Sequence, residues 1–440
     1  MMFHRVAVAS FLVSVLTLTS TSDSSSSSSS SVSAFQSSIS PRSSFHPQQQ
    51  QQQQQQKKND APVAFLSAAA STDTETTTTE ADTAELLPEY QAALEQAKKS
   101  IAAVIEKTQP ELIKPLNHFC TEYMTASQAS YLKYKDDDAK PDKALQRILE
   151  GVQYGNKFGM GPDKYTFGVT HDALRGDPET EDGNELDYYK WGCDFFRQFM
   201  DKDKSAVEGL DNLKKAMDQA AAGENVVFFA NHQSEADPQV MSMMLEKAGY
   251  EDEASKIVYV AGHKVTTDPL AIPFSMGRNL ICIHSKKYVD SDPDTKGVKN
   301  RQNLAAMGGM LEKLKKGGCL LWVAPSGGRD RRDVETGKTP IAPFDSKTAD
   351  MFKIMGRKSK VKTHYYPLAM VSYELCPPPD FVEAGVGEQR NFRFVPVGVQ
   401  VGEEVVPSKE TDFGAEVYEQ TLKDYIQLRE KLFPGTAPEV

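Results

Sequence analysis

The sequence predicts an α/β fold, in which a largely parallel mixed sheet is flanked by helices and preceded by a small helical-bundle domain. Two observations support this prediction. Apolar residues recur at helical spacing before about residue 161, and beyond residue 221 short unbroken apolar runs alternate with helical stretches. Strands that are buried on both faces read as unbroken apolar runs, and their alternation with helices implies parallel pairing. The expected strands are residues 226–230, 257–261, 280–283, 319–324, 365–371 and 392–399.

The first helices are predicted from spacings of three and four residues. Leu86, Tyr90, Ala93 and Ala97 recur in this way, which places them on one face of a helix. Further helices are expected over residues 111–134, 143–152, 188–200 and 207–221, and a closing amphipathic helix over residues 411–432. We therefore divide the folded chain into an N-terminal helical domain at residues 84–164 and an α/β domain at residues 165–440.

Residues 1–83 have the composition of a targeting presequence with a disordered low-complexity segment. Arg5 precedes an apolar run at residues 6–16, which is too short to span a bilayer. Runs of serine, glutamine and threonine then follow, and these cannot form a core. Ser33-Ala34-Phe35 resembles the cleavage point in the bipartite signal and transit presequence of algae with secondary plastids, which implies the plastid stroma. The alternative is a secretory signal followed by disordered filler.

The charge balance and the cysteines limit the classes of function. A net charge of -11 argues against nucleic-acid binding, which depends on a basic surface. The five cysteines are odd in number and contain no C-x-x-C pair, so we expect reduced thiols in a reducing compartment. No apolar stretch approaches the roughly 18 to 20 residues of a membrane-spanning helix. At most peripheral membrane contact is therefore expected.

A histidine and an aspartate follow the first predicted strand. His232 and Asp237 lie between the apolar run at residues 226–230 and an apolar helix. Polar groups at the carboxyl end of a buried strand, beside a helix N-terminus, occupy the usual ligand position of α/β proteins. A turn at the step from Asp237 to Pro238 would let the two side chains pair. Because histidine titrates near neutral pH and a carboxylate fixes its tautomer, the pair predicts a general-base dyad.

Other interpretations of this segment remain open on spacing alone. Asp237 could simply cap the helix, with His232 as a hydrogen-bonded turn histidine. Ser234 lacks the G-x-S-x-G surroundings of a hydrolase nucleophile, so direct attack of a substrate hydroxyl on a thioester needs fewer assumptions. A second histidine at ligand spacing is missing, and we predict neither a metal nor a cofactor.

A basic cluster stands out in this acidic protein. Residues 285–332 contain eleven Lys and Arg against five Asp and Glu, a local charge of +6. Lys287 and Tyr288 follow one predicted strand, and Arg329 and Arg331 follow another, just after a Gly-Gly pair. Glycines allow close approach of a ligand, and guanidinium groups suit a phosphate dianion. The cluster therefore predicts a phosphate site, although its outer lysines could instead guide an acidic carrier protein.

Together these segments resemble the glycerolipid acyltransferases. Residues 231–238 match the H-x4-D motif of that family. The blocks at residues 267–269, 273–281, 285–287 and 324–331 are similar to the soluble glycerol-3-phosphate acyltransferases of plastids in particular. The resemblance implies transfer of a fatty acyl group from acyl-acyl carrier protein or acyl-CoA to the sn-1 hydroxyl of glycerol 3-phosphate, which gives lysophosphatidic acid.

The resemblance also implies roles for single residues. His232 would be the base and Asp237 its orienting partner, while Lys287, Arg329 and Arg331 would hold the phosphate. Tyr288 stands where the family has histidine, so it brings a hydrogen-bond donor without a positive charge.

Two rival functions share parts of this pattern. Lysophosphatidate acyltransferases share the H-x4-D chemistry, but they usually have Glu-Gly-Thr-Arg as their second block and hydrophobic membrane anchors. This chain has Ser-Gly-Gly-Arg at residues 326–329. A non-catalytic acyl-carrier or lipid-binding module is the other alternative, and the intact pair of His232 and Asp237 argues against it.

Overall fold

The computed structural model of the protein describes residues 85–106, 110–154, 166–176, 186–268, 270–285, 289–379, 389–408 and 410–438. The predicted presequence at residues 1–83 lies outside the described residues, as do Lys287 and Tyr288. The predictions made for them stay predictions. Within the described ranges, no helix combines the length and the apolar composition needed to cross a membrane.

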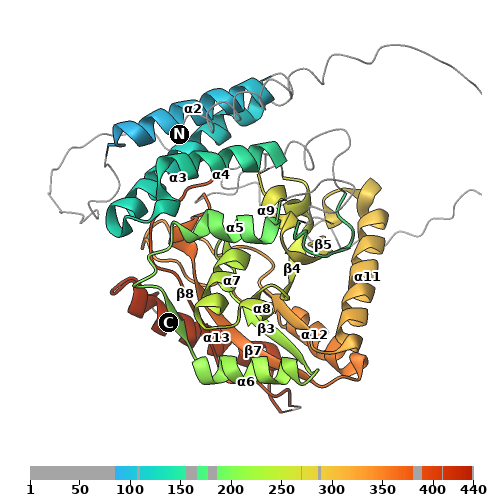
Figure 1. Cartoon of the computed structure of the whole chain (residues 1–440). Helices are drawn as coiled ribbons and strands as arrows, with labels where there is room; N and C mark the ends of the chain where they lie inside the picture. The colour runs from blue at the N-terminus through green and yellow to red at the C-terminus, as the bar shows by residue number, and fades with distance from the viewer. Residues whose placement is uncertain are drawn as a thin grey trace, which may run out of the picture. The chain divides into compact units, whose positions relative to one another are not determined.

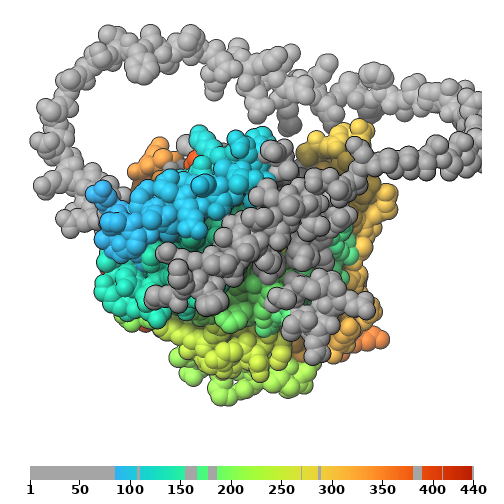
Figure 2. All heavy atoms as spheres, turned by 45° about the horizontal axis from the view of Figure 1, so that its top comes forward, coloured from blue at the N-terminus to red at the C-terminus, as the bar shows by residue number. Residues whose placement is uncertain are grey.

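Three helices open the described chain, as the sequence predicts: α2 (Pro88–Ile105), α3 (Ile113–Tyr134) and α4 (Pro141–Tyr154). The short 3₁₀ helices η1 (Pro110–Leu112) and η2 (Asp137–Ala139) connect them. Tyr90, Ala93 and Ala97 are buried on the inner face of α2, and the Tyr90 hydroxyl donates a hydrogen bond of 2.8 Å to the carbonyl of Ala139. The outer face of α2, in blue, is visible in Figure 2.

An eight-stranded mixed sheet forms the centre of the α/β part, in the order β1-β5-β4-β6-β3-β7-β8-β2. Strands β3, β4, β5, β6 and β7 pair in parallel, whereas β1 and β8 pair antiparallel with β5 and β7. The predicted fold class is therefore confirmed. The strands are β1 (Thr170–His171), β2 (Ala206–Glu208), β3 (Asn225–Ala230), β4 (Val258–Gly262), β5 (Asn279–Ile283), β6 (Leu320–Val323), β7 (Thr363–Val371) and β8 (Gly398–Val401).

Helices cover both faces of this sheet (Figure 1). On β3, Val226 and Phe228 point into a core shared with α5, α6 and α7, while Val227 and Phe229 point into a core shared with α11, α12 and α13. Burial on both faces explains why β3 reads as an unbroken apolar run. The helices are α5 (Tyr188–Arg197), α6 (Leu210–Ala221), α7 (Asp237–Lys247), α8 (Glu251–Ala254), α9 (Ile272–Met276), α11 (Pro293–Lys316), α12 (Ser346–Ser359) and α13 (Phe413–Leu432), with 3₁₀ helices η4 (His263–Thr266) and η5 (Tyr373–Leu375).

Two predicted elements differ from the structure. The helix expected over residues 207–221 begins only at Leu210, because Ala206–Glu208 forms the edge strand β2 and Gly209 turns the chain at a φ of 69°. The strand expected over residues 392–399 enters the sheet only at Gly398. Its first residue, Phe392, instead packs edge-on against Phe119 of α3, with ring centroids 5.0 Å apart.

The helical bundle and the sheet share one apolar core. Tyr123 of α3 packs against Phe195 of α5, with ring centroids 4.4 Å apart. Both belong to the compact unit Thr79–Val440. The boundary predicted between residues 164 and 165 lies within the undescribed residues 155–165. The two-domain division therefore stays a prediction.

Candidate active site

His232 lies at the carboxyl edge of the sheet, on the loop of residues 231–236 that joins β3 to α7. We call this segment the site loop. The neighbouring strand β6 ends at Val323 and leads into residues 324–332, which carry the predicted cations. The two connections are in contact, because the backbone amide of Asp330 donates to the carbonyl of His232 at 2.5 Å. Parallel strands thus bring His232 and the connection that carries Arg329 and Arg331 to one edge.

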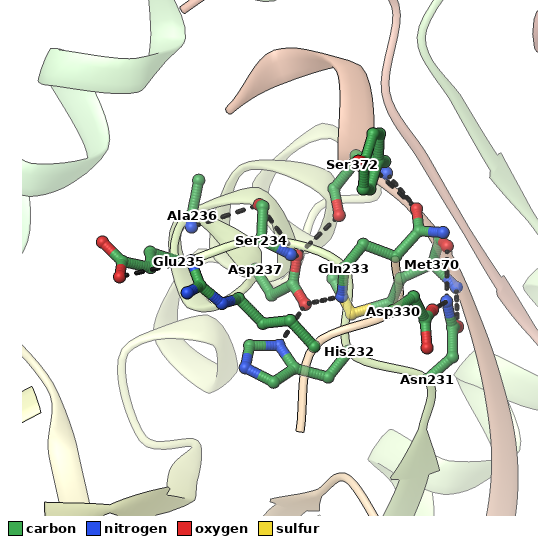
Figure 3. A network of polar contacts seen from close by, with 12 residues as sticks. Asn231, His232, Gln233, Ser234, Glu235, Ala236, Asp237, Asp330, Met370 and Ser372 are labelled. Atoms are coloured by element: carbon green, nitrogen blue, oxygen red, sulfur yellow. Dashed lines mark hydrogen bonds and ion pairs between the residues drawn. The ribbon is translucent and has the colours of Figure 1, made fainter. Parts of the chain in front are cut away.

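His232 and Asp237 form a hydrogen-bonded pair. The His232 Nδ1 atom is 2.8 Å from Asp237 Oδ2, and the Asp237 side chain is completely buried (Figure 3). Asp237 also accepts hydrogen bonds from the backbone amides of Gln233 and Ser234, which precede the helix. An N-cap carboxylate accepts from the amides of the first helical turn instead. The capping interpretation of Asp237 is therefore wrong, and its carboxylate serves the site loop.

The residue that follows β7 supports the same carboxylate. The Ser372 hydroxyl donates to Asp237 Oδ1 at 2.5 Å, and the Ser234 hydroxyl donates to the same oxygen at 3.1 Å. Ser372 was not predicted as a site residue. Nothing in its local sequence marks it, since it lies 135 residues from Asp237 and meets it only through the pairing of β3 with β7.

Two side-chain amides fasten the site loop to β7. Asn231 donates to the carbonyl of Met370 at 3.0 Å and accepts from its amide at 2.8 Å. The Gln233 Oε1 atom accepts from the backbone amides of Ser372 and Tyr373. Both side chains are buried, so they continue the hydrogen bonding of the sheet past the point where β3 leaves it. The backbone on either side of His232 is thereby fixed.

Asp330 is a second buried carboxyl group beside His232. It accepts from the backbone amide of Ala342 at 2.8 Å and from the Asn231 side chain at 3.2 Å. Burial raises the pKa of Asp330 to about 7. With the backbone contact to His232, this residue holds the turn that carries the two predicted arginines.

The indole ring of Trp322 packs against the imidazole of His232. Trp322 of β6 is buried and meets the His232 ring edge-on, with ring centroids 5.8 Å apart. The contact fixes the plane of the imidazole, whose side chain keeps 27% of its surface exposed. Nδ1 is engaged by Asp237, so Nε2 is the nitrogen that can exchange a proton with a ligand.

The predicted arginines are placed differently. Arg329 reaches the site loop, where its Nη1 atom is 3.3 Å from Oε1 of Glu235. Arg331 donates through Nη1 to the carbonyl of Pro379 at 2.5 Å. The structure thus brings His232, Glu235 and Arg329 onto adjoining turns. Arg390, which was not predicted, pairs with Glu235 through two hydrogen bonds of 3.0 and 3.2 Å.

The comparison with protein families matches this part of the chain. Residues 204–371, which contain β3, the site loop and β6, match the family model described as Acyltransferase.

Curated acyltransferases of higher plants are similar to it in sequence. The glycerol-3-phosphate acyltransferase, chloroplastic, of Arabidopsis thaliana is 38% identical over 262 residues, which are 60% of this chain and 53% of that protein. Those of Spinacia oleracea and Carthamus tinctorius are 38% identical over 55% and 58% of this chain and over 50% and 53% of their own lengths. The chain therefore spans about half the length of the curated relatives it matches.

The burial of the Asp237 carboxylate predicts that replacing it by the amide is costly. Asp237→Asn keeps the shape but turns an NH2 group toward donors, so we expect the free energy of unfolding in urea to fall by about 2 to 4 kcal/mol. Ser372→Ala removes one donor and should cost about 1 kcal/mol. Asp424→Asn is the matched control, because the described donors to this buried carboxyl are the flexible side-chain amides of Gln400 and Gln420. Equal losses in Asp237→Asn and Asp424→Asn would contradict the prediction.

Proposed function

We propose that the protein is a glycerol-3-phosphate 1-O-acyltransferase. It transfers a fatty acyl group from acyl-acyl carrier protein or acyl-CoA to the sn-1 hydroxyl of glycerol 3-phosphate, and the product is lysophosphatidic acid. The observation that carries the proposal is the His232 and Asp237 pair, with Nδ1 and Oδ2 2.8 Å apart, beside a turn that carries Arg329. The names of the plant relatives support the choice of substrate.

In the proposed mechanism His232 is a general base. Its Nε2 atom takes the proton of the substrate hydroxyl as the oxygen attacks the thioester carbonyl, and Asp237 stabilises the imidazolium that forms. The tetrahedral intermediate then collapses, the carbon–sulfur bond breaks, and the proton passes to the departing thiolate. No covalent acyl-enzyme is formed. The hydroxyl of Ser234 donates to Asp237 and accepts from the amide of Ala236, which supports a structural role for this residue.

The phosphate of the substrate is proposed to bind Lys287, Tyr288, Arg329 and Arg331. Guanidinium groups suit a phosphate dianion, and the turn that carries both arginines is held against His232 by the buried Asp330. The phenol of Tyr288 would donate a hydrogen bond. The reaction needs no metal or other cofactor in this proposal, and the acidic net charge argues against a nucleic-acid partner.

Loss of His232 should abolish most of the turnover. For His232→Ala we expect kcat to fall by about 10² to 10⁴-fold or more, as for loss of a general base, when labelled glycerol 3-phosphate is acylated from either donor. His118→Ala is the control, because His118 lies in the helical bundle and bonds to Asn391. Equal activity of His232→Ala and the wild type would rule out the mechanism.

Arg329→Ala tests the phosphate assignment. We expect the KM for glycerol 3-phosphate to rise by about tenfold or more, since a charge-assisted contact to the phosphate is lost, with a smaller change in the KM for the acyl donor. Arg357→Ala removes an exposed arginine of α12 and should leave both constants unchanged. An effect confined to the acyl donor would show that Arg329 does not bind the phosphate.

The protein is proposed to work in the plastid stroma, with at most peripheral membrane contact. The chloroplastic relatives and the leader composition support this location. Residues 1–60 fused to a fluorescent protein should direct it into plastids of an alga with secondary plastids, as seen by microscopy. The same fusion without residues 1–34 should remain outside them. Secretion of the full fusion would contradict the plastid assignment.

A further inference from the structure

Arg390 is a buried cation held between two carboxylates. Its side chain is 7% exposed, and its Nη2 atom lies 2.7 Å from Oδ2 of Asp268, which is 3% exposed. The same guanidinium binds Glu235 through Nε at 3.0 Å and through Nη2 at 3.2 Å. Burial acts to lower the pKa of Arg390, but the two carboxylates outweigh it and leave the pKa raised. Arg390 is therefore charged, and it is shared between two acidic partners.

Glu235 is in turn shared between two arginines. Its Oε1 atom accepts from Nη2 of Arg390 at 3.2 Å and from Nη1 of Arg329 at 3.3 Å. The contact with Arg390 is bidentate, because Oε2 also accepts from Arg390 Nε. A bidentate pair is the stronger of the two kinds of contact. Arg390 thus takes the larger part of the Glu235 charge.

The charges of Asp268, Glu235, Arg390 and Arg329 explain why the sharing of Glu235 between two arginines affects Arg329. Among the contacts described here, Asp268 and Glu235 supply two negative charges, and Arg390 and Arg329 supply two positive charges. If Arg390 were absent, the buried Asp268 and the partly exposed Glu235 would lose the cation that they share, and Glu235 would keep its contact with Arg329. A buried charge without a partner is costly, so Glu235 would draw Arg329 into a full ion pair. An arginine held in this way binds a phosphate less well, because the phosphate must displace the carboxylate.

We propose that Arg390 is a positioning residue of the phosphate site: it neutralises Glu235 and so leaves the Arg329 guanidinium able to bind the phosphate of glycerol 3-phosphate. The inference rests on the proposed function. Arg390 acts through Glu235 and Arg329, and it does not need to touch the substrate. It also gives Glu235, three residues after His232 in the site loop, a role in substrate affinity.

The test measures binding of glycerol 3-phosphate alone by isothermal titration calorimetry, without an acyl donor. Arg390→Gln should raise the Kd by about tenfold or more, because loss of a charge-assisted contact is worth about that factor. In steady-state assays the same variant should raise the KM for glycerol 3-phosphate more than it lowers kcat. The double variant Arg390→Gln with Glu235→Gln should bring the Kd back to within about threefold of the wild type, since the competing carboxylate is gone.

A matched control separates this role from a general loss of stability. Arg429 is another buried arginine, 5% exposed, and it pairs with Glu374 through two hydrogen bonds of 2.6 Å. Arg429→Gln should lower the melting temperature without changing the Kd. If Arg390→Gln does not fold, Arg390→Lys keeps the charge but cannot bridge both carboxylates in the same way, and an intermediate Kd is expected.

The outcomes distinguish the inference from the proposed function. A wild-type protein that does not bind glycerol 3-phosphate overturns the proposed function itself. A wild type that binds it, together with Arg390 variants of unchanged Kd, overturns only the inference. A double variant that binds glycerol 3-phosphate as weakly as Arg390→Gln also overturns the inference. If the role of Arg390 were purely structural, replacing Glu235 would not restore the affinity.

Discussion

The site depends on one buried charge, the carboxylate of Asp237. A carboxylate with no exposed surface is costly unless donors surround it. The described contacts supply five hydrogen bonds, from His232, the amides of Gln233 and Ser234, and the hydroxyls of Ser234 and Ser372. These donors come from the site loop and from Ser372, the residue that follows β7. Satisfying one charge therefore fixes the shape of the loop and the orientation of the imidazole together.

The order of the strands makes this arrangement available. β3 lies between β6 and β7, and all three run parallel, so their carboxyl ends meet at one edge. The connection after β7 supplies Ser372, and the connection after β6 supplies Asp330, Arg329 and Arg331. Asn231 and Gln233 bond to the backbone of residues 370–373, which prevents the loop from separating from the sheet. A site whose geometry is held by backbone contacts on rigid strands does not need a ligand to organise it.

The balance between buried charges and their partners also governs the arginines near His232. Arginine binds phosphate well only when its charge is not already used by a protein carboxylate. Glu235 is in contact with Arg329, and we propose that the bidentate contact of Glu235 with Arg390 weakens its hold on Arg329. Affinity for an anionic ligand then depends on the balance of charges in the network as well as on the residues that touch the ligand.

The sequence by itself determined the fold class and the location of the site. Unbroken apolar runs reveal strands buried on both faces, and the H-x4-D segment is local, so the pairing of His232 with Asp237 requires only a turn of a few residues. Only the tertiary structure decided how that pair is supported. Ser372 lies 135 residues from Asp237, and Arg390 lies 155 residues from Glu235. No periodicity or spacing in the sequence marks such partners. A contact between distant segments depends on which strands become neighbours, and no single segment of the sequence determines the strand order.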